Sequence, residues 1–79
     1  MKVEVHLFAT LAAYLPTGAA GDGVTLEVPD ATTVGEVVRV LGIPEDLDSL
    51  RIVNGHDAPS EHCLVDGDVL SLFPPLAGG

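Results

Sequence analysis

The residues best suited to chemistry lie at the carboxyl end of this 79-residue chain, which finishes in Gly78 and Gly79. A pair of glycines has no Cβ atoms, so its backbone passes through slots too narrow for other residues and adopts whichever φ a binding site imposes. The group that would react is the terminal carboxylate of Gly79. At neutral pH this carboxylate is ionised and is a poor electrophile, so it needs activation before a nucleophile attacks it.

Activation by ATP would turn this carboxylate into the carrier of a transferable group. Transfer of AMP would give an acyl-adenylate, and a sulfur nucleophile that displaces AMP would leave a thiocarboxylate, a mobile sulfur donor. Pro74 and Pro75 would direct this end away from the sheet, because proline has no N–H to extend a β-ladder and favours polyproline II. We therefore expect a flexible, extended tail over residues 74–79, with a reach of up to about 20 Å, after a folded domain over residues 1–73.

Two segments with alternating apolar residues lie in the first third of the chain. Residues 3–7 and 24–28 each place Val or Leu at every second position, which is typical of strands with one buried face. The short gap between them favours a hairpin-like pair. Within that gap, residues 9–15 carry helix formers and Pro16 follows them, which indicates one or two helical turns.

One amphipathic helix is predicted in the middle of the chain. It begins after Thr33, where Glu36 three residues on completes a capping box, and Gly42 favours the left-handed conformation that closes helices. Apolar residues follow the i, i+3, i+4, i+7 spacing of one helix face. They are Val34, Val37, Val38 and Leu41.

The second half of the chain indicates further strands. Residues 50–53 and 69–73 are strand-like, Asn54-Gly55 is typical of a hairpin turn, and Asp66-Gly67 marks another turn. Two strands, one helix and then further strands predict an α+β domain, with a mixed sheet of four to five strands packed on one main helix.

Size and charge exclude several classes of protein. A chain of 79 residues buries only about 60% of its surface, so a substrate pocket walled by its own residues is hard to fit. Twelve acidic residues against three Lys and Arg give a formal net charge of −9, which disfavours nucleic acid and membrane surfaces and favours a basic protein partner. A single cysteine, Cys63, and the lack of a long apolar segment predict a cytoplasmic protein without an internal disulfide or a membrane span.

Some residues have an ordinary interpretation beside a functional one. Cys63 follows His62, with His56 nearby, but the spacing matches no zinc site, so packing is the favoured role for this thiol and no metal site is expected. Phe8 and Phe73 are either core residues or exposed aromatic residues that mark an interface, and the sequence leaves both interpretations open.

Four short blocks, taken in order along the whole chain, resemble one family. They are the ending Phe73-Pro74-Pro75-Leu76-Ala77-Gly78-Gly79, the preceding Leu64-Val65-Asp66-Gly67-Asp68-Val69, then Ile52-Val53-Asn54-Gly55 and Leu7-Phe8-Ala9. They resemble the MoaD/ThiS sulfur carriers of ubiquitin-like β-grasp fold, and the ending is more similar to MoaD, the small subunit of molybdopterin synthase, than to the thiamine-pathway carrier. The chain departs from the family pattern at Ala12, where Arg is common, and at His56 and Asp57, where an aliphatic residue is common.

The resemblance implies that the chain is a protein cosubstrate with no catalytic residue of its own. An E1-like enzyme of the MoeB/ThiF type would adenylate Gly79, with ATP used by that partner and no cofactor bound to the chain. Sulfur would come from a donor such as a cysteine desulfurase or rhodanese and would be delivered with a MoaE-like large subunit, which makes the dithiolene of molybdopterin. Phe8 and Phe73 match apolar positions that contact partners. The segment that would enter a partner's channel is Pro74, Pro75, Leu76, Ala77 and Gly78.

Other uses of the same tail stay open. A sulfur carrier for thiamine or another thiolation pathway would end in the same way. A ubiquitin-like modifier would pass the activated Gly79 to a lysine amine of another protein. A plain interaction module, in which the tail is incidental, is the third hypothesis.

Overall fold

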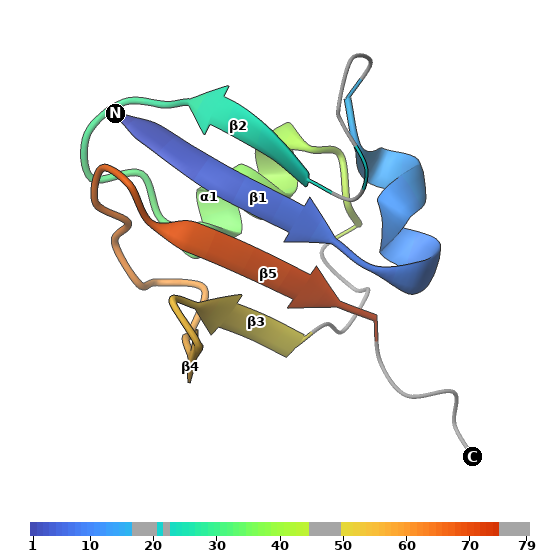
Figure 1. Ribbon diagram of the computed structural model, residues 1–79. Helices are drawn as coiled ribbons and strands as arrows, with labels where there is room; N and C mark the ends of the chain where they lie inside the picture. Colours follow the sequence, from blue (N-terminus) through green and yellow to red (C-terminus); the bar gives the residue numbers. More distant parts are fainter. Residues whose placement is uncertain (17–20, 22, 45–49, 75–79) are drawn as a thin grey trace.

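The computed structural model describes residues 1–16, 21, 23–44 and 50–74. They form one five-stranded sheet with a single α-helix packed on one side (Figure 1). The strand order is β2-β1-β5-β3-β4; β1 and β5 are parallel and the other neighbours are antiparallel. The predicted α+β architecture with a mixed sheet on one main helix is confirmed. The elements are β1 (Lys2–Leu7), the 3₁₀ helix η1 (Ala9–Tyr14), β2 (Gly23–Glu27), α1 (Val34–Val40), β3 (Leu50–Val53), β4 (His56–Asp57) and β5 (Val69–Phe73).

The first two strands follow the predicted alternation. β1 and β2 pair antiparallel over residues 2–6 and 23–27, which confirms the hairpin-like pair. Val3, Val5 and Leu7 have no exposed surface, whereas the residues between them lie on the other face of the sheet.

The helix α1 begins and ends where the sequence predicts. The Thr33 hydroxyl accepts a hydrogen bond from the Glu36 N–H at 3.2 Å, and the Thr33 N–H donates to the Glu36 carboxylate at 3.0 Å, which completes the capping box. Gly42 beyond the last turn has a φ of 82°. Gly35 is a poor helix former, but a Cβ there would lie 3.2 Å from Ser60, so its small size permits close packing. In the described ranges no helix is long and apolar enough to cross a membrane.

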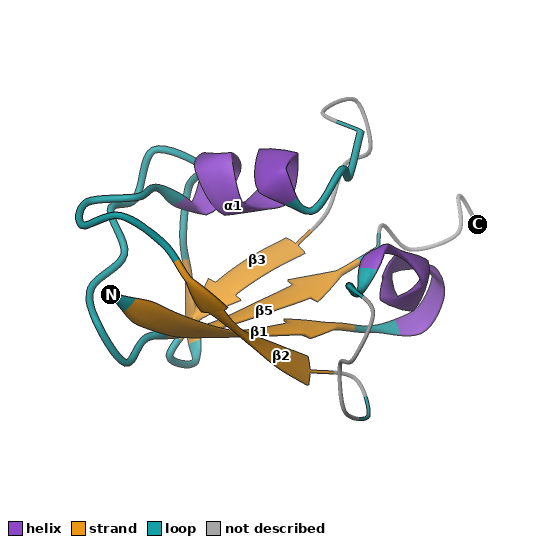
Figure 2. Cartoon of the chain, turned by 90° about the horizontal axis from the view of Figure 1, so that it is seen from above, coloured by secondary structure: helices purple, strands orange, loops and turns teal. Residues whose placement is uncertain are grey.

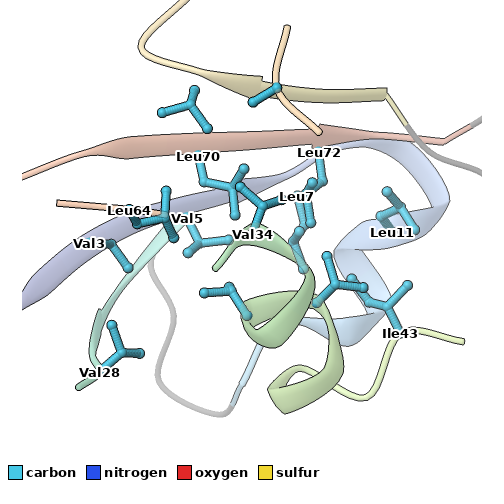
Figure 3. Packing of buried hydrophobic residues seen from close by; sticks show 14 residues of the cluster. Val3, Val5, Leu7, Leu11, Val28, Val34, Ile43, Leu64, Leu70 and Leu72 are labelled. Carbon is cyan, nitrogen blue, oxygen red and sulfur yellow. The ribbon is translucent and has the colours of Figure 1, made fainter. Parts of the chain in front are cut away.

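The buried core lies between α1 and one face of the sheet (Figures 2 and 3). It is built almost entirely from Val and Leu, and each fully buried side chain of this size contributes about 1.5–3 kcal/mol of transfer free energy. The core uses one face of the sheet only. The core residues with no exposed surface are Val3, Val5, Leu7, Leu11, Val34, Val37, Leu70 and Leu72.

A buried polar pair fixes the turn that leads into β5. The Asn54 side-chain amide donates to the Asp68 carboxylate at 2.8 Å, and the Val65 N–H donates to the other oxygen of that carboxylate at 2.9 Å. The Asn54 carbonyl oxygen in turn accepts from the Val69 N–H at 2.9 Å. Gly67 has a φ of 88°, as the predicted turn requires. Because Asp68 is only 6% exposed, these bonds compensate the loss of water around its carboxylate.

Candidate functional site

The face of the sheet opposite α1 is not covered by any described element (Figure 2). We call it the open face. It carries every second residue of the strands, because side chains alternate across a sheet. The residues of the open face, all half-buried or exposed, are Thr25 and Glu27 of β2, Glu4 and His6 of β1 with Phe8 just beyond it, Val69, Ser71 and Phe73 of β5, and Leu50 and Ile52 of β3.

Phe8 and Phe73 stack on each other on the open face. Their ring centroids are 4.5 Å apart and their planes differ by 4°. The parallel pairing of β1 with β5 produces this contact, because it places Leu7 beside Leu72 and joins the Phe8 N–H to the Leu72 carbonyl at 3.2 Å. Both rings are half-buried, and neither belongs to the buried core. The structure therefore resolves the choice that the sequence left open: these rings are surface residues that shield each other.

Two aliphatic residues of β3 extend the stacked rings into a patch. Leu50 lies opposite Phe73 and is 51% exposed, and Ile52 lies opposite Ser71. We call Phe8, Phe73, Leu50 and Ile52 the aromatic patch. An exposed apolar patch beside polar residues is typical of a protein interaction site. The alternation of β3 could have indicated the contribution of Leu50 and Ile52, but only the strand order shows that β3 lies beside β5.

A polar neighbour borders the aromatic patch on β1. The His6 ring stacks at 6.3 Å from the Phe8 ring, and its Nε2 atom is hydrogen-bonded to the Glu4 carboxylate. The ring lies against the backbone of β2, since a Cβ at Gly23 would be 2.6 Å from the His6 ring. As expected, His6 lies on the polar side of its strand, where it forms one end of the row of rings.

The aromatic patch lies where the predicted tail begins. β5 is the central strand of the sheet, it ends at Phe73, and Pro74 follows as a half-buried residue. The first residue expected in the partner's channel is therefore adjacent to the patch. The other residues expected to act there, Pro75, Leu76, Ala77, Gly78 and Gly79, lie outside the described residues.

A second hollow lies beside the hairpin of β3 and β4. It has a volume of about 330 Å³, and its lining includes His56, His62, Cys63, Val53 and Asp68. Cys63 is exposed, so the sequence-based preference for a packing role is wrong; the neighbouring Leu64 occupies the core instead. Within the described ranges, no three His, Cys, Asp or Glu side chains are grouped so that they could hold a metal ion.

Comparison with protein families gives one match. The family model described as Mut7-C ubiquitin matches residues 1–77, which is nearly the whole chain. No protein with a curated function matches the sequence significantly.

Solved structures of similar proteins come from archaea and bacteria. The HVO 2177 protein of Haloferax volcanii is 30% identical, with coverage of 100% of this chain and 87% of that chain and a TM-score of 0.79. SAMP1, the small archaeal modifier protein 1 of the same organism, is 28% identical over 100% of both chains, with a TM-score of 0.75.

A bacterial complex also contains a similar chain. It joins subunits 1 and 2 of the molybdopterin-converting factor from Helicobacter pylori, and the similar chain is 26% identical over 100% of both chains, with a TM-score of 0.62. Together these similarities confirm the ubiquitin-like β-grasp fold and the resemblance to MoaD-like proteins.

Proposed function

The chain belongs to the Mut7-C ubiquitin family, and on this basis we propose that it is a sulfur carrier whose terminal Gly79 carboxylate is converted to a thiocarboxylate. The observation that carries the proposal is the position of the aromatic patch. An uncovered surface suited to a partner lies at the end of the central strand, directly before the uncharged residues that lead to Gly78 and Gly79. A partner that docks on the patch is therefore within about 20 Å of the carboxylate, the reach of an extended six-residue segment.

The proposed reaction has two steps. In the first, a Gly79 carboxylate oxygen attacks the α-phosphorus of ATP and pyrophosphate leaves, which forms an acyl-adenylate. In the second, hydrosulfide attacks the acyl carbon, a C–S bond forms, the C–O bond to AMP breaks, and the thiocarboxylate remains. An E1-like activating enzyme uses the ATP and supplies the catalytic groups. The chain supplies the terminal carboxylate and the surface that positions it.

Two observations support partner proteins for this chain. A similar chain is part of the two-subunit molybdopterin-converting factor of Helicobacter pylori. The net charge of −9 favours partners with basic surfaces, and it would speed their association at low salt. We assign the chain to the same type of pair: a small carrier that delivers sulfur, with a MoaE-like large subunit, to the dithiolene of molybdopterin.

Intact-mass measurement tests the sulfur-carrier proposal. The purified chain is incubated with an E1-like enzyme, ATP and sulfide, and replacement of one oxygen by sulfur raises its mass by about 16 Da. The chain that lacks Gly79 is the matched control and should keep its original mass. An unchanged mass in the full chain, with an enzyme that thiolates another carrier in the same assay, would contradict the proposal. Thiolation of the truncated chain would show that the terminal carboxylate is not the site.

A second function is favoured by the similarity to SAMP1, a protein named as a modifier. In this alternative, a lysine amine attacks the activated Gly79 and forms an amide bond to another protein. Expression of a tagged chain distinguishes the two functions. High-mass conjugates that disappear with the Gly79 deletion would favour the modifier, whereas sulfur transfer to a small molecule without conjugates would favour the carrier. The only lysine of the chain is Lys2, so lysine-linked chains have one internal attachment point.

A further inference from the structure

The strand β2 forms one border of the sheet, and no described element lies beyond it (Figure 1). Its five residues pair with β1 on one side only. An unpaired strand edge can accept a further strand through main-chain hydrogen bonds, and natural proteins usually shorten, charge or cover such edges. The edge of β2 therefore differs from the aromatic patch, which presents side chains.

The pairing with β1 determines which backbone groups of β2 face outward. The Val28 N–H donates to the Met1 carbonyl at 2.9 Å, and the Met1 amino group donates to the Val28 carbonyl at 2.8 Å. In an antiparallel pair the residues facing the partner alternate, so Thr25 and Glu27 direct their N–H and C=O groups away from β1. In the described part of the chain, these outward groups have no hydrogen-bonding partner. Two donors and two acceptors are thus available along the edge.

The side chains of β2 define what an added strand would meet on each side. Val24 and Leu26 are half-buried and pack against the core, so part of each side chain is exposed on the α1 side. Thr25 and Glu27 are exposed on the open face, where Glu4 lies opposite Thr25. An added strand would place every second residue against Val24 and Leu26 and the others near the carboxylates, because side chains alternate across a sheet.

Charge selects one occupant for this edge. Glu27 and Glu4 lie on the open face, and Asp30, just after β2, has a side chain that is 95% exposed. Lys2 is the one Lys or Arg of β1 and β2. A second copy of the chain would bring another net charge of −9 to the same place, which is unfavourable.

We infer that the free edge of β2 binds an extended segment of a partner protein in which apolar residues alternate with lysine or arginine. The segment would extend the sheet by one strand, with backbone hydrogen bonds to Thr25 and Glu27. Its apolar residues would pack beside Val24 and Leu26, and its basic residues would lie near Glu27. This second interface does not depend on the proposed function, and it leaves Phe8 and Phe73 free for another partner.

The probe for this test is an acetylated and amidated decapeptide of alternating lysine and valine. It is titrated into the full chain labelled with ¹⁵N, and the amide signals are followed by NMR. The largest shift changes and the strongest slowing of amide hydrogen exchange are expected at Thr25 and Glu27. A decapeptide of alternating glutamate and valine is the charge control and should bind at least about tenfold more weakly. The affinity for the lysine peptide should fall as salt rises.

Two pairs of variants test the backbone and the charge separately. Thr25→Pro removes one outward N–H at a position where an edge strand accepts proline, and it should weaken peptide binding about tenfold, whereas Thr25→Ala keeps the N–H and should bind normally. Thermal unfolding checks that each variant folds. If Thr25→Pro does not fold, Glu27→Lys serves instead and should weaken binding several-fold. Glu61→Lys, an exposed position outside β1 and β2 with the same charge change, should have no effect.

Three results would overturn the inference. The first is a set of shift changes confined to Phe8 and Phe73. The second is equal binding of the acidic and basic peptides. The third is self-association of the chain without peptide, measured by sedimentation equilibrium and abolished by Thr25→Pro, because that would make a second copy the occupant of the edge.

Discussion

The two faces of the sheet are made from the same strands, yet they solve different problems. On the side of α1, Val and Leu residues from β1 and β5 pack without exposed surface. On the open face, the largest apolar side chains are Phe8 and Phe73, which remain half-buried and cover each other. Stacking removes part of each ring from water without filling the surface with a helix. The comparison indicates that the first face maintains the fold and that the second is reserved for contact.

Replacing leucine by alanine on each face gives the largest expected contrast. Leu70 has no exposed surface, so Leu70→Ala should lower the free energy of unfolding by about 2–5 kcal/mol through lost burial and a cavity. Leu50 is 51% exposed, and Leu50→Ala should cost less than about 1 kcal/mol. Urea denaturation measures both. Equal losses would show that the open face is part of the stabilising core and would end the distinction between the faces.

Removing one ring of the aromatic patch should affect binding more than stability. Phe73→Ala is expected to weaken association with an activating enzyme by at least about tenfold, because a central aromatic contact is lost. Its unfolding free energy should fall by only about 1–2 kcal/mol, since the ring is half-exposed. Calorimetric titration and urea denaturation give the two numbers.

A double-mutant cycle gives the control for this prediction. Phe8→Ala, Phe73→Ala and the double variant should show a coupling of about 0.5–1.5 kcal/mol in stability from the stacked pair. Normal enzyme binding by the double variant would remove the aromatic patch from the proposed interface.

The sequence was most informative where a local pattern determines the structure. The capping box of Thr33 and Glu36 and the alternation in β1 predicted the helix start and the buried face correctly, because each depends on neighbouring residues. The exposure of Cys63 was missed because the loop containing it bends back to form a bridge with Thr33, 30 positions earlier.

The candidate site was only partly predictable for the same reason. Phe8 and Phe73 are 65 positions apart in the sequence, and nothing near either residue shows that their rings stack. Their contact depends on the parallel pairing of β1 with β5, which joins the two ends of the chain. Leu50 and Ile52 join them because β3 is the other neighbour of β5. A surface assembled across three strands is a property of topology, which local patterns do not encode.

A methyl group at Gly23 would test how firmly the row of rings on the open face is held. A Cβ at this position would lie 2.6 Å from the His6 ring, so Gly23→Ala should displace that ring and cost about 1 kcal/mol of stability. The ring signals of His6 and Phe8 should shift in the NMR spectrum. Thr25→Ala, two residues along the same strand at an exposed position, is the control and should leave these signals unchanged. Unchanged ring signals in Gly23→Ala would show that β2 does not hold the His6 ring.

Neutralising the carboxylate beside His6 should have the smallest effect, and it separates folding from binding on the open face. Glu4 is hydrogen-bonded to His6, but half of its side chain is exposed, so water and salt weaken this interaction. Glu4→Gln should therefore change the free energy of unfolding by less than about 0.5 kcal/mol. The same substitution removes one negative charge near the aromatic patch, so it should slow association with a basic partner at low salt and lose this effect at high salt. Stopped-flow association rates at two salt concentrations measure the difference, and Glu61→Gln is the matched control. If both variants slow association equally, the total charge attracts the partner, whereas a larger effect of Glu4→Gln places the approach on the open face.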